Sequence, residues 1–266
     1  MTVEFVPGMQ TPRRNPTPLI DPVHKIILFW MHRCGSTTGQ LWFFQAAGWK
    51  DRMAGKGASQ LTPVWLAEHE EVYRDLERYY RDPSFLKIAV VRNPLTRAVS
   101  TFSVVTDSIS GSQWRTVSRS LEAPDPERRL TFLEFLDFLE LDELSTANYH
   151  WRLQSAQDWY DLALPGIEFV RVESLQDDLD RMCGLLGRPR IAMKRSSATT
   201  KVEEDLSGVD LASLTRADLA RVFGRDRRGV IQFPDYSYFL TKDTVGRLAK
   251  LYTRDFATLG YSAQSR

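Results

Sequence analysis

Few features of this sequence point directly to a class of protein, and the absences are informative. The only cysteines in 266 residues are Cys34 and Cys183, and because the first lies in a predicted loop and the second in a helical stretch, we expect no disulfide between them. A formal net charge of +1 lacks the basic excess of nucleic-acid-binding proteins, so no nucleic-acid partner is expected. No apolar run is long enough to span a bilayer, and residues 1–22 are polar and rich in proline, without the apolar core of a signal peptide.

A metal-ligand pattern is also missing from the sequence. The histidines are His24, His32, His69 and His150. None of them has ligand spacing with the two cysteines, so we expect no structural metal. What the chain does have is 42% hydrophobic and 26% charged residues, which is enough to bury the core of one globular domain.

The first informative segment is KIILFWMHRCGSTT, residues 25–38. Its apolar run from Ile26 to Met31 has no polar break, which is typical of a buried parallel strand, and a helical pattern follows the small residues. The amides of a first helical turn have no partner within the helix, and the helix dipole favours negative charge there. We therefore expect an anion site in which Arg33 supplies the positive charge, Gly35 permits close approach and Ser36 is the N-cap. The alternative is an ordinary strand-to-helix turn.

A second segment repeats this arrangement at LKIAVVRNPLTRAVS, residues 86–100. A strand over Ile88 to Val91 delivers Arg92, and Pro94 then opens a helix that carries Arg97 and Ser100. A charge that ends a buried strand needs a partner, so Arg92 is a candidate anion ligand. Arg97 is expected to be a solvated helix residue.

The two segments resemble motifs of the sulfotransferases that use 3′-phosphoadenosine-5′-phosphosulfate (PAPS), and especially those of the carbohydrate branch. HRCGSTT is similar to the loop that holds the 5′-phosphosulfate, and VRNPLTRAVSTF is similar to the 3′-phosphate motif. Residues 147–154, ANYHWRLQ, resemble the His-Trp-Arg segment of this branch, and residues 248–261 resemble its C-terminal helix. The resemblance runs from about residue 25 to residue 261.

This resemblance implies an α/β fold, with a parallel central sheet flanked by helices in a P-loop-like arrangement. It implies transfer of a sulfuryl group from PAPS to an acceptor hydroxyl, on a carbohydrate or glycoconjugate, with adenosine 3′,5′-bisphosphate as product. The residues that it assigns to nucleotide binding are Arg33, Cys34, Gly35, Ser36, Thr37, Thr38, Arg92 and Ser100.

The chemistry needs charge stabilisation and a base. Arg33 would neutralise charge on the bridging oxygen, and because the leaving group is a weakly basic phosphate no metal is required. His150 is the candidate base, since an unperturbed imidazole titrates near neutrality. A structural role for His150 is the alternative, and His32 or a carboxylate within residues 107–143 are the other candidate bases.

Other readings of the sequence stay open. A P-loop kinase would carry GxxxxGK[ST], which does not occur here, and a non-catalytic nucleotide-binding protein would share the fold. The acceptor could also be a lipid-linked glycan, a peptide tyrosine or a small metabolite. Without the membrane anchor of Golgi relatives, the chain is expected to be a soluble, cytoplasmic enzyme of bacterial type or a trimmed chain. The sequence does not indicate an oligomeric state.

The expected layout is an N-terminal extension over residues 1–22 and a single domain over residues 23–266. Within it, residues 107–129 mix Ser, Gly, Pro and balanced charges, which predicts a long loop. Trp114 in that loop is the residue that could face a sugar ring. Thr131 and Glu134 form a capping-box pattern, which predicts a helix start with an apolar face turned to the core. Cytosolic members of the family that the chain resembles often carry a Trp near the adenine, at the position where this chain has Gly39. Trp42 or Trp30 could therefore contact the adenine instead.

Overall fold

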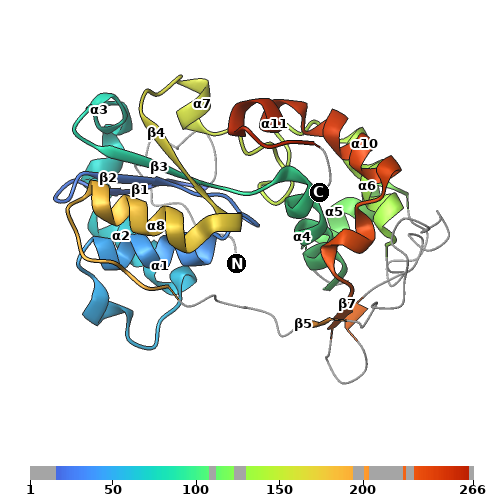
Figure 1. The fold of residues 1–266 in the computed structure, drawn as a ribbon, viewed down its shortest axis with the longest axis horizontal. Helices are drawn as coiled ribbons and strands as arrows, with labels where there is room; N and C mark the ends of the chain where they lie inside the picture. The colour runs from blue at the N-terminus through green and yellow to red at the C-terminus, as the bar shows by residue number, and fades with distance from the viewer. Residues whose placement is uncertain are drawn as a thin grey trace. The chain divides into compact units, whose positions relative to one another are not determined.

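The structure, a computed structural model, describes residues 16–107, 112–122, 130–193, 201–203, 224–225 and 231–263. The chain divides into two compact units, which Figure 1 shows in ribbon form. Unit 1 consists of Met1–Arg92 and Gln154–Ser196, and unit 2 consists of Asn93–Leu153 and Ser197–Arg266. Both units are therefore built from two separate stretches of chain.

Unit 1 contains a four-stranded sheet in the order β1-β2-β3-β4. The strands are β1 (Leu19–Asp21), β2 (Ile26–Phe29), β3 (Leu86–Val91) and β4 (Ile167–Arg171). β1 runs antiparallel to β2, whereas β2, β3 and β4 are parallel. Every residue of β2 and nearly all of β3 are buried, as expected for β-branched and apolar strands covered on both faces. The predicted α/β class with a mainly parallel sheet is confirmed.

Helices cover both faces of this sheet. They are α1 (Ser36–Ala46), α2 (Ala58–Glu68), α3 (Leu76–Arg81), α7 (Asp158–Asp161) and α8 (Leu175–Leu185), with 3-10 turns η1 (Lys50–Met53), η2 (Glu70–Arg74) and η3 (Val172–Ser174). Residues of α1, α2 and α8 share one apolar core with alternate strand residues such as Leu28 and Val90, and Figure 1 shows these helices on the same side of the sheet. On the other face, the ring of Phe29 lies 5.5 Å from that of Tyr80 in α3.

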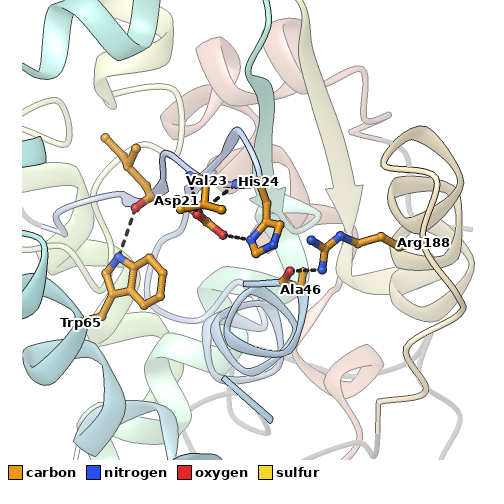
Figure 2. A network of polar contacts seen from close by, with 7 residues as sticks. Asp21, Val23, His24, Ala46, Trp65 and Arg188 are labelled. Carbon is orange, nitrogen blue, oxygen red and sulfur yellow. Dashed lines mark hydrogen bonds and ion pairs between the residues drawn. The ribbon is translucent and has the colours of Figure 1, made fainter. Parts of the chain in front are cut away.

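The turn between β1 and β2 is fixed by the buried carboxylate of Asp21, as Figure 2 shows. Its Oδ1 accepts from the amides of Val23 at 2.9 Å and His24 at 3.1 Å, and its Oδ2 lies 2.6 Å from His24 Nδ1. Trp65 of α2 donates its indole N–H to the carbonyl of Ile20 at 3.2 Å. Residues 19–21 thus belong to the sheet, although the sequence pattern predicts an extension as far as residue 22. Their short length and the proline-rich flank conceal the strand.

Unit 2 is mostly helical. Its elements are α4 (Pro94–Asp107), α5 (Ser112–Ser120), α6 (Phe132–Leu141), η5 (Tyr236–Phe239), α10 (Lys242–Leu251) and α11 (Thr253–Leu259), and a small sheet in the order β5-β7-β6 (Lys201–Glu203, Ile231–Phe233, Gly224–Arg225). The capping box that opens α6 is confirmed, because Glu134 N–H donates to Thr131 Oγ1 and Thr131 N–H donates to Glu134 Oε2. The apolar face of α6 packs in an aromatic core with Phe102 and Phe239.

Helix α5 lies inside the segment for which the sequence pattern predicts a long loop. Trp114 and Val117 are buried at helical spacing, while Arg115 and Thr116 between them are exposed. The prediction that Trp114 could face a sugar ring is wrong, because its side chain is only 1% exposed. A short helix with one narrow apolar face has too weak a pattern to be recognised among Ser, Gly and Pro. Residues 108–111 and 123–129 of the predicted loop lie outside the described residues.

Candidate functional site

The loop between β2 and α1 has an unusual backbone. Arg33 has a φ of 68° and Gly35 a φ of 63°, so both adopt the left-handed conformation, which is rare for a residue with a side chain such as Arg33. Strained backbone of this kind clusters at functional sites, although Lys25, Glu122 and Ala163 also have positive φ in this chain. The amide of Cys34 donates to the carbonyl of Met31 at 3.2 Å and closes the turn.

The helix that follows this loop presents free amides. Its first i to i−4 hydrogen bond runs from Gly39 N–H to the Gly35 carbonyl at 3.0 Å. The N–H groups of residues 36–38 precede that bond and have no carbonyl within the helix to receive them. The N-cap is Gly35 and not Ser36 as predicted, because the left-handed glycine turns the chain into the helix without a side-chain cap. This arrangement favours an anion at the start of α1.

Glycine is required at two positions of this segment. A Cβ on Gly35 would lie 3.1 Å from Val172 Cγ2 and would sit on a residue with positive φ. A Cβ on Gly39 would lie 2.9 Å from Val90 Cγ2, closer than real Cβ contacts. Gly39 therefore lets α1 approach β3 closely. No aromatic side chain could replace it in this packing.

Arg92 lies beside the first loop. β2 and β3 are parallel neighbours, so their carboxyl ends meet at one edge of the sheet. The guanidinium of Arg92 donates through Nη1 to the carbonyl of Arg33 at 3.2 Å. The two predicted anion ligands in unit 1, Arg33 and Arg92, are thus brought together at this edge.

Gln154 connects both loops. Its Oε1 accepts from the amide of Arg92 at 2.9 Å and from the Cys34 thiol at 3.0 Å, and its Nε2 donates to the Arg92 carbonyl at 2.8 Å. Its side chain is fully buried, with 0% exposure. The Cys34 side chain accordingly points inward, which does not support a direct contact of this thiol with a ligand. Gln154 is the last residue of the segment ANYHWRLQ, but the sequence does not indicate its bonds to the two loops, since a glutamine at the end of an irregular segment is usually exposed.

A cavity of about 200 Å³ adjoins the start of α1. It is lined by Thr38, by residues 173–177 at the start of α8, and by Met193. Thr38 thus belongs both to the first helical turn and to the wall of this cavity. The cavity lies within unit 1 and offers a concave space next to the anion loop.

In unit 2, side chains hold four successive carbonyls of residues 149–152. Arg97 donates to the carbonyls of Arg152 at 2.7 Å and Tyr149 at 3.3 Å. Thr101 Oγ1 donates to the His150 carbonyl at 2.9 Å, and the Tyr252 hydroxyl donates to the Trp151 carbonyl at 2.9 Å. The expectation of a solvated Arg97 is wrong: the side chain is 1% exposed, because the carbonyls of an irregular buried segment need donors.

The comparison with known families decides what kind of protein carries these loops. The model described as the sulfotransferase family matches residues 16–262, which takes in nearly all of both units. The chain belongs to the sulfotransferase family. No match was found among curated proteins or among solved structures.

The candidate base of this sulfotransferase, His150, is held tightly. Its backbone amide donates to Asn148 Oδ1 at 3.0 Å, and the residue as a whole is only 9% exposed. The amide nitrogen of Gln113, on α5, lies 3.2 Å from His150 Nε2. The sequence does not signal Gln113, because α5 itself is not recognised there.

The remaining predicted residues of the sulfotransferase have these positions. Ser100 is buried on α4 in unit 2, and its role at the nucleotide stays a prediction. Trp42 is fully buried in the core of unit 1, whereas Trp30 is partly exposed and donates its indole N–H to the Thr17 carbonyl at 2.9 Å. Trp42 is therefore unsuited to a contact with the adenine ring of the nucleotide.

In the described part of the chain, no cluster of three or more His, Cys, Asp or Glu residues could hold a metal ion. None of the helices in the described ranges has both the length and the apolarity that crossing a membrane requires.

Proposed function

We propose that this sulfotransferase transfers a sulfuryl group from PAPS to an acceptor hydroxyl, and that the acceptor is a carbohydrate. The observation that carries the proposal is the hydrogen bond from the Arg92 guanidinium to the Arg33 carbonyl, at 3.2 Å. It brings two cationic residues together beside the free amides at the start of α1. PAPS carries one anionic group at its 5′ end and another at its 3′ position, and such a pair of anion sites fits it.

Each loop is assigned one end of the nucleotide. Arg33, Gly35 and the amides and hydroxyls of residues 36–38 would hold the 5′-phosphosulfate. Arg92, together with Ser100, would hold the 3′-phosphate. The cavity beside Thr38 supports this assignment, since it leaves room for further parts of the ligand next to the loop.

In the transfer step, the acceptor oxygen forms a bond to sulfur while the bond between sulfur and the bridging phosphate oxygen breaks. The electron pair of the broken bond goes to the 5′-phosphate, where Arg33 and the helix amides would stabilise the growing charge. The proton of the acceptor hydroxyl goes to His150. In the structure, His150 Nε2 lies 3.2 Å from the amide nitrogen of Gln113. A preformed arrangement of donors supplies most of the catalysis in such a displacement.

The carbohydrate acceptor is supported by the resemblance of residues 147–154 to the His-Trp-Arg segment of the carbohydrate branch. The segment is held by Arg97, Thr101 and Tyr252, so its residues are presented in a fixed conformation. A lipid-linked glycan, a peptide tyrosine and a small metabolite are the acceptors against which this proposal should be tested.

The experiment is transfer of labelled sulfate from PAPS to a panel of these acceptors. We expect transfer to a carbohydrate, and a loss of roughly a hundredfold or more in His150→Ala, the usual share of general-base catalysis. Binding of adenosine 3′,5′-bisphosphate should stay unchanged in this variant. His69→Ala is the matched control, because His69 stacks on Trp65 at 3.9 Å and has no part in the proposed site. Transfer to a tyrosine peptide alone would refute the carbohydrate acceptor, and full activity in His150→Ala would move the base to His32 or to a carboxylate.

A further inference from the structure

We propose that Gln154 is a positioning residue that sets the spacing between the two anion loops, and that it thereby selects nucleotides with phosphates at both the 3′ and the 5′ positions. The inference rests on the proposed function, because it assigns one phosphate to each loop. It goes beyond that function by naming what fixes the distance between the two phosphate sites.

The side chain of Gln154 bonds to both loops. One oxygen, Oε1, accepts from the Cys34 thiol on the first loop and from the Arg92 amide on the second. The same side chain donates from Nε2 to the Arg92 carbonyl at 2.8 Å. Both main-chain polar groups of Arg92 are therefore bonded to one side-chain amide. This fixes the direction in which the Arg92 side chain leaves the backbone.

The strand pairing of the sheet stops before both arginines. The ladder between β2 and β3 ends at the pair Phe29 and Ala89, and the ladder between β3 and β4 ends at Val91 and Arg171. Arg33 and Arg92 both lie beyond these last pairs. The side-chain amide of Gln154 continues the bonding of β3 by one residue, as a neighbouring strand would.

The position of Gln154 is itself fixed. The Gln157 side chain donates through Nε2 to the Gln154 carbonyl at 3.1 Å, and both glutamine side chains are buried. A buried amide whose donor and acceptor are both bonded to backbone or thiol groups has little freedom to rotate. The spacing of the loops is thus held by a rigid element.

A fixed spacing matters only to a ligand that contacts both loops. For adenosine 3′,5′-bisphosphate the second phosphate binds as an intramolecular event, whose strength depends on the match between the two sites. A nucleotide with a single phosphate contacts one loop and does not sense the distance between them. The preference for the bisphosphate over the monophosphates is therefore the quantity that Gln154 should control.

The test is calorimetric titration of the full chain with adenosine 3′,5′-bisphosphate, adenosine 5′-monophosphate and adenosine 3′-monophosphate. The variant Gln154→Met keeps the length of the side chain and loses its hydrogen bonds. The ratio of the affinity for the bisphosphate to the affinity for either monophosphate should then fall about tenfold, which is the effect of losing one hydrogen bond. The control is Gln40→Met, which removes a buried amide of α1 that accepts from Thr62 Oγ1 on α2. Its ratio should equal that of the parent.

A milder variant covers the case in which Gln154→Met does not fold. Cys34→Ala removes only the donor from the first loop, so the ratio should fall in the same direction by about twofold to threefold, less than a full neutral hydrogen bond. An unchanged ratio in a folded Gln154→Met and in Cys34→Ala, or equal weakening of all three ligands, would overturn the role of Gln154 and leave the proposed function intact. A parent that shows no binding of the bisphosphate would instead overturn the proposed function.

Discussion

Arg33 allows backbone strain and charge to be tested separately. Its φ of 68° places a residue with a Cβ in the left-handed region. Arg33→Ala keeps the Cβ and the strain, whereas Arg33→Gly removes both. We expect the Gly variant to be more stable than the Ala variant by about 1 kcal/mol, which is about 2–4 °C in Tm for a chain of this size.

Both substitutions remove the same guanidinium. Loss of a charge-assisted hydrogen bond should weaken binding of adenosine 3′,5′-bisphosphate by about 1.5–3 kcal/mol, or roughly 10-fold to 150-fold. The transfer rate at saturation should fall further, because Arg33 would stabilise charge that develops only as the bond to sulfur breaks. Arg33→Lys should retain part of both properties, since a point charge survives.

Thermal unfolding of the three variants measures the strain, and calorimetry with single-turnover transfer measures the charge. An Ala variant at least as stable as the Gly variant would refute the reasoning about strain. If Arg33→Ala and Arg33→Gly both kept the affinity and the transfer rate of the parent, Arg33 would not belong to the site. A loss of affinity with an unchanged saturated rate would limit Arg33 to binding.

Three further predictions concern packing, the segment around the candidate base, and pH. Gly39→Ala should destabilise unit 1 by about 1–3 kcal/mol through overpacking, because the new Cβ would lie 2.9 Å from Val90 Cγ2. In urea unfolding, the added substitution Val90→Ala should offset part of this loss, and additive effects of the two substitutions would contradict the clash. Arg97→Met should lower stability by about 1–3 kcal/mol for each carbonyl left without a donor, and it should slow transfer without weakening bisphosphate binding. Arg97→Lys should restore part of both properties, and a stable, fully active Met variant would argue that Arg97 does not hold the segment of residues 149–152. Burial, with the nearby Asp158 carboxylate, raises the pKa of the Tyr80 phenol above its usual value of 10.0. The stability that the protonated phenol contributes is therefore present below about pH 10 and is lost as the pH rises further. Tyr80→Phe should flatten the decline of the unfolding free energy at alkaline pH, and an unchanged slope would count against this assignment.

The strand, loop and helix at residues 26–46 are predictable because their determinants are local. An unbroken apolar run specifies a buried strand, and a glycine followed by hydroxyl residues specifies a turn into a helix. The same holds for the strand before Arg92 and for the helix that Pro94 opens. The exact N-cap is not predictable, since it depends on the left-handed conformation of Gly35.

The parts that fail depend on contacts between distant segments. Arg97 has the pattern of an exposed helix residue, but the carbonyls that it binds belong to a segment more than fifty residues later in the chain. The contacts of Gln154, the last residue of ANYHWRLQ, and of Gln113 are not predictable from the sequence, because the partners of a polar residue lie on distant segments. Trp114 shows the reverse, an apolar residue in a polar context that a short helix turns inward.

The measurement that tests the central claim most directly is a crystal structure of the protein with adenosine 3′,5′-bisphosphate. We expect the 5′-phosphate within hydrogen-bond distance of the amides of Ser36, Thr37 and Thr38, and the 3′-phosphate on the guanidinium of Arg92. Gln154 should keep its bonds to Cys34 and Arg92 in that complex. A bisphosphate bound away from both loops, or with both phosphates on one of them, would contradict the assignment of the site.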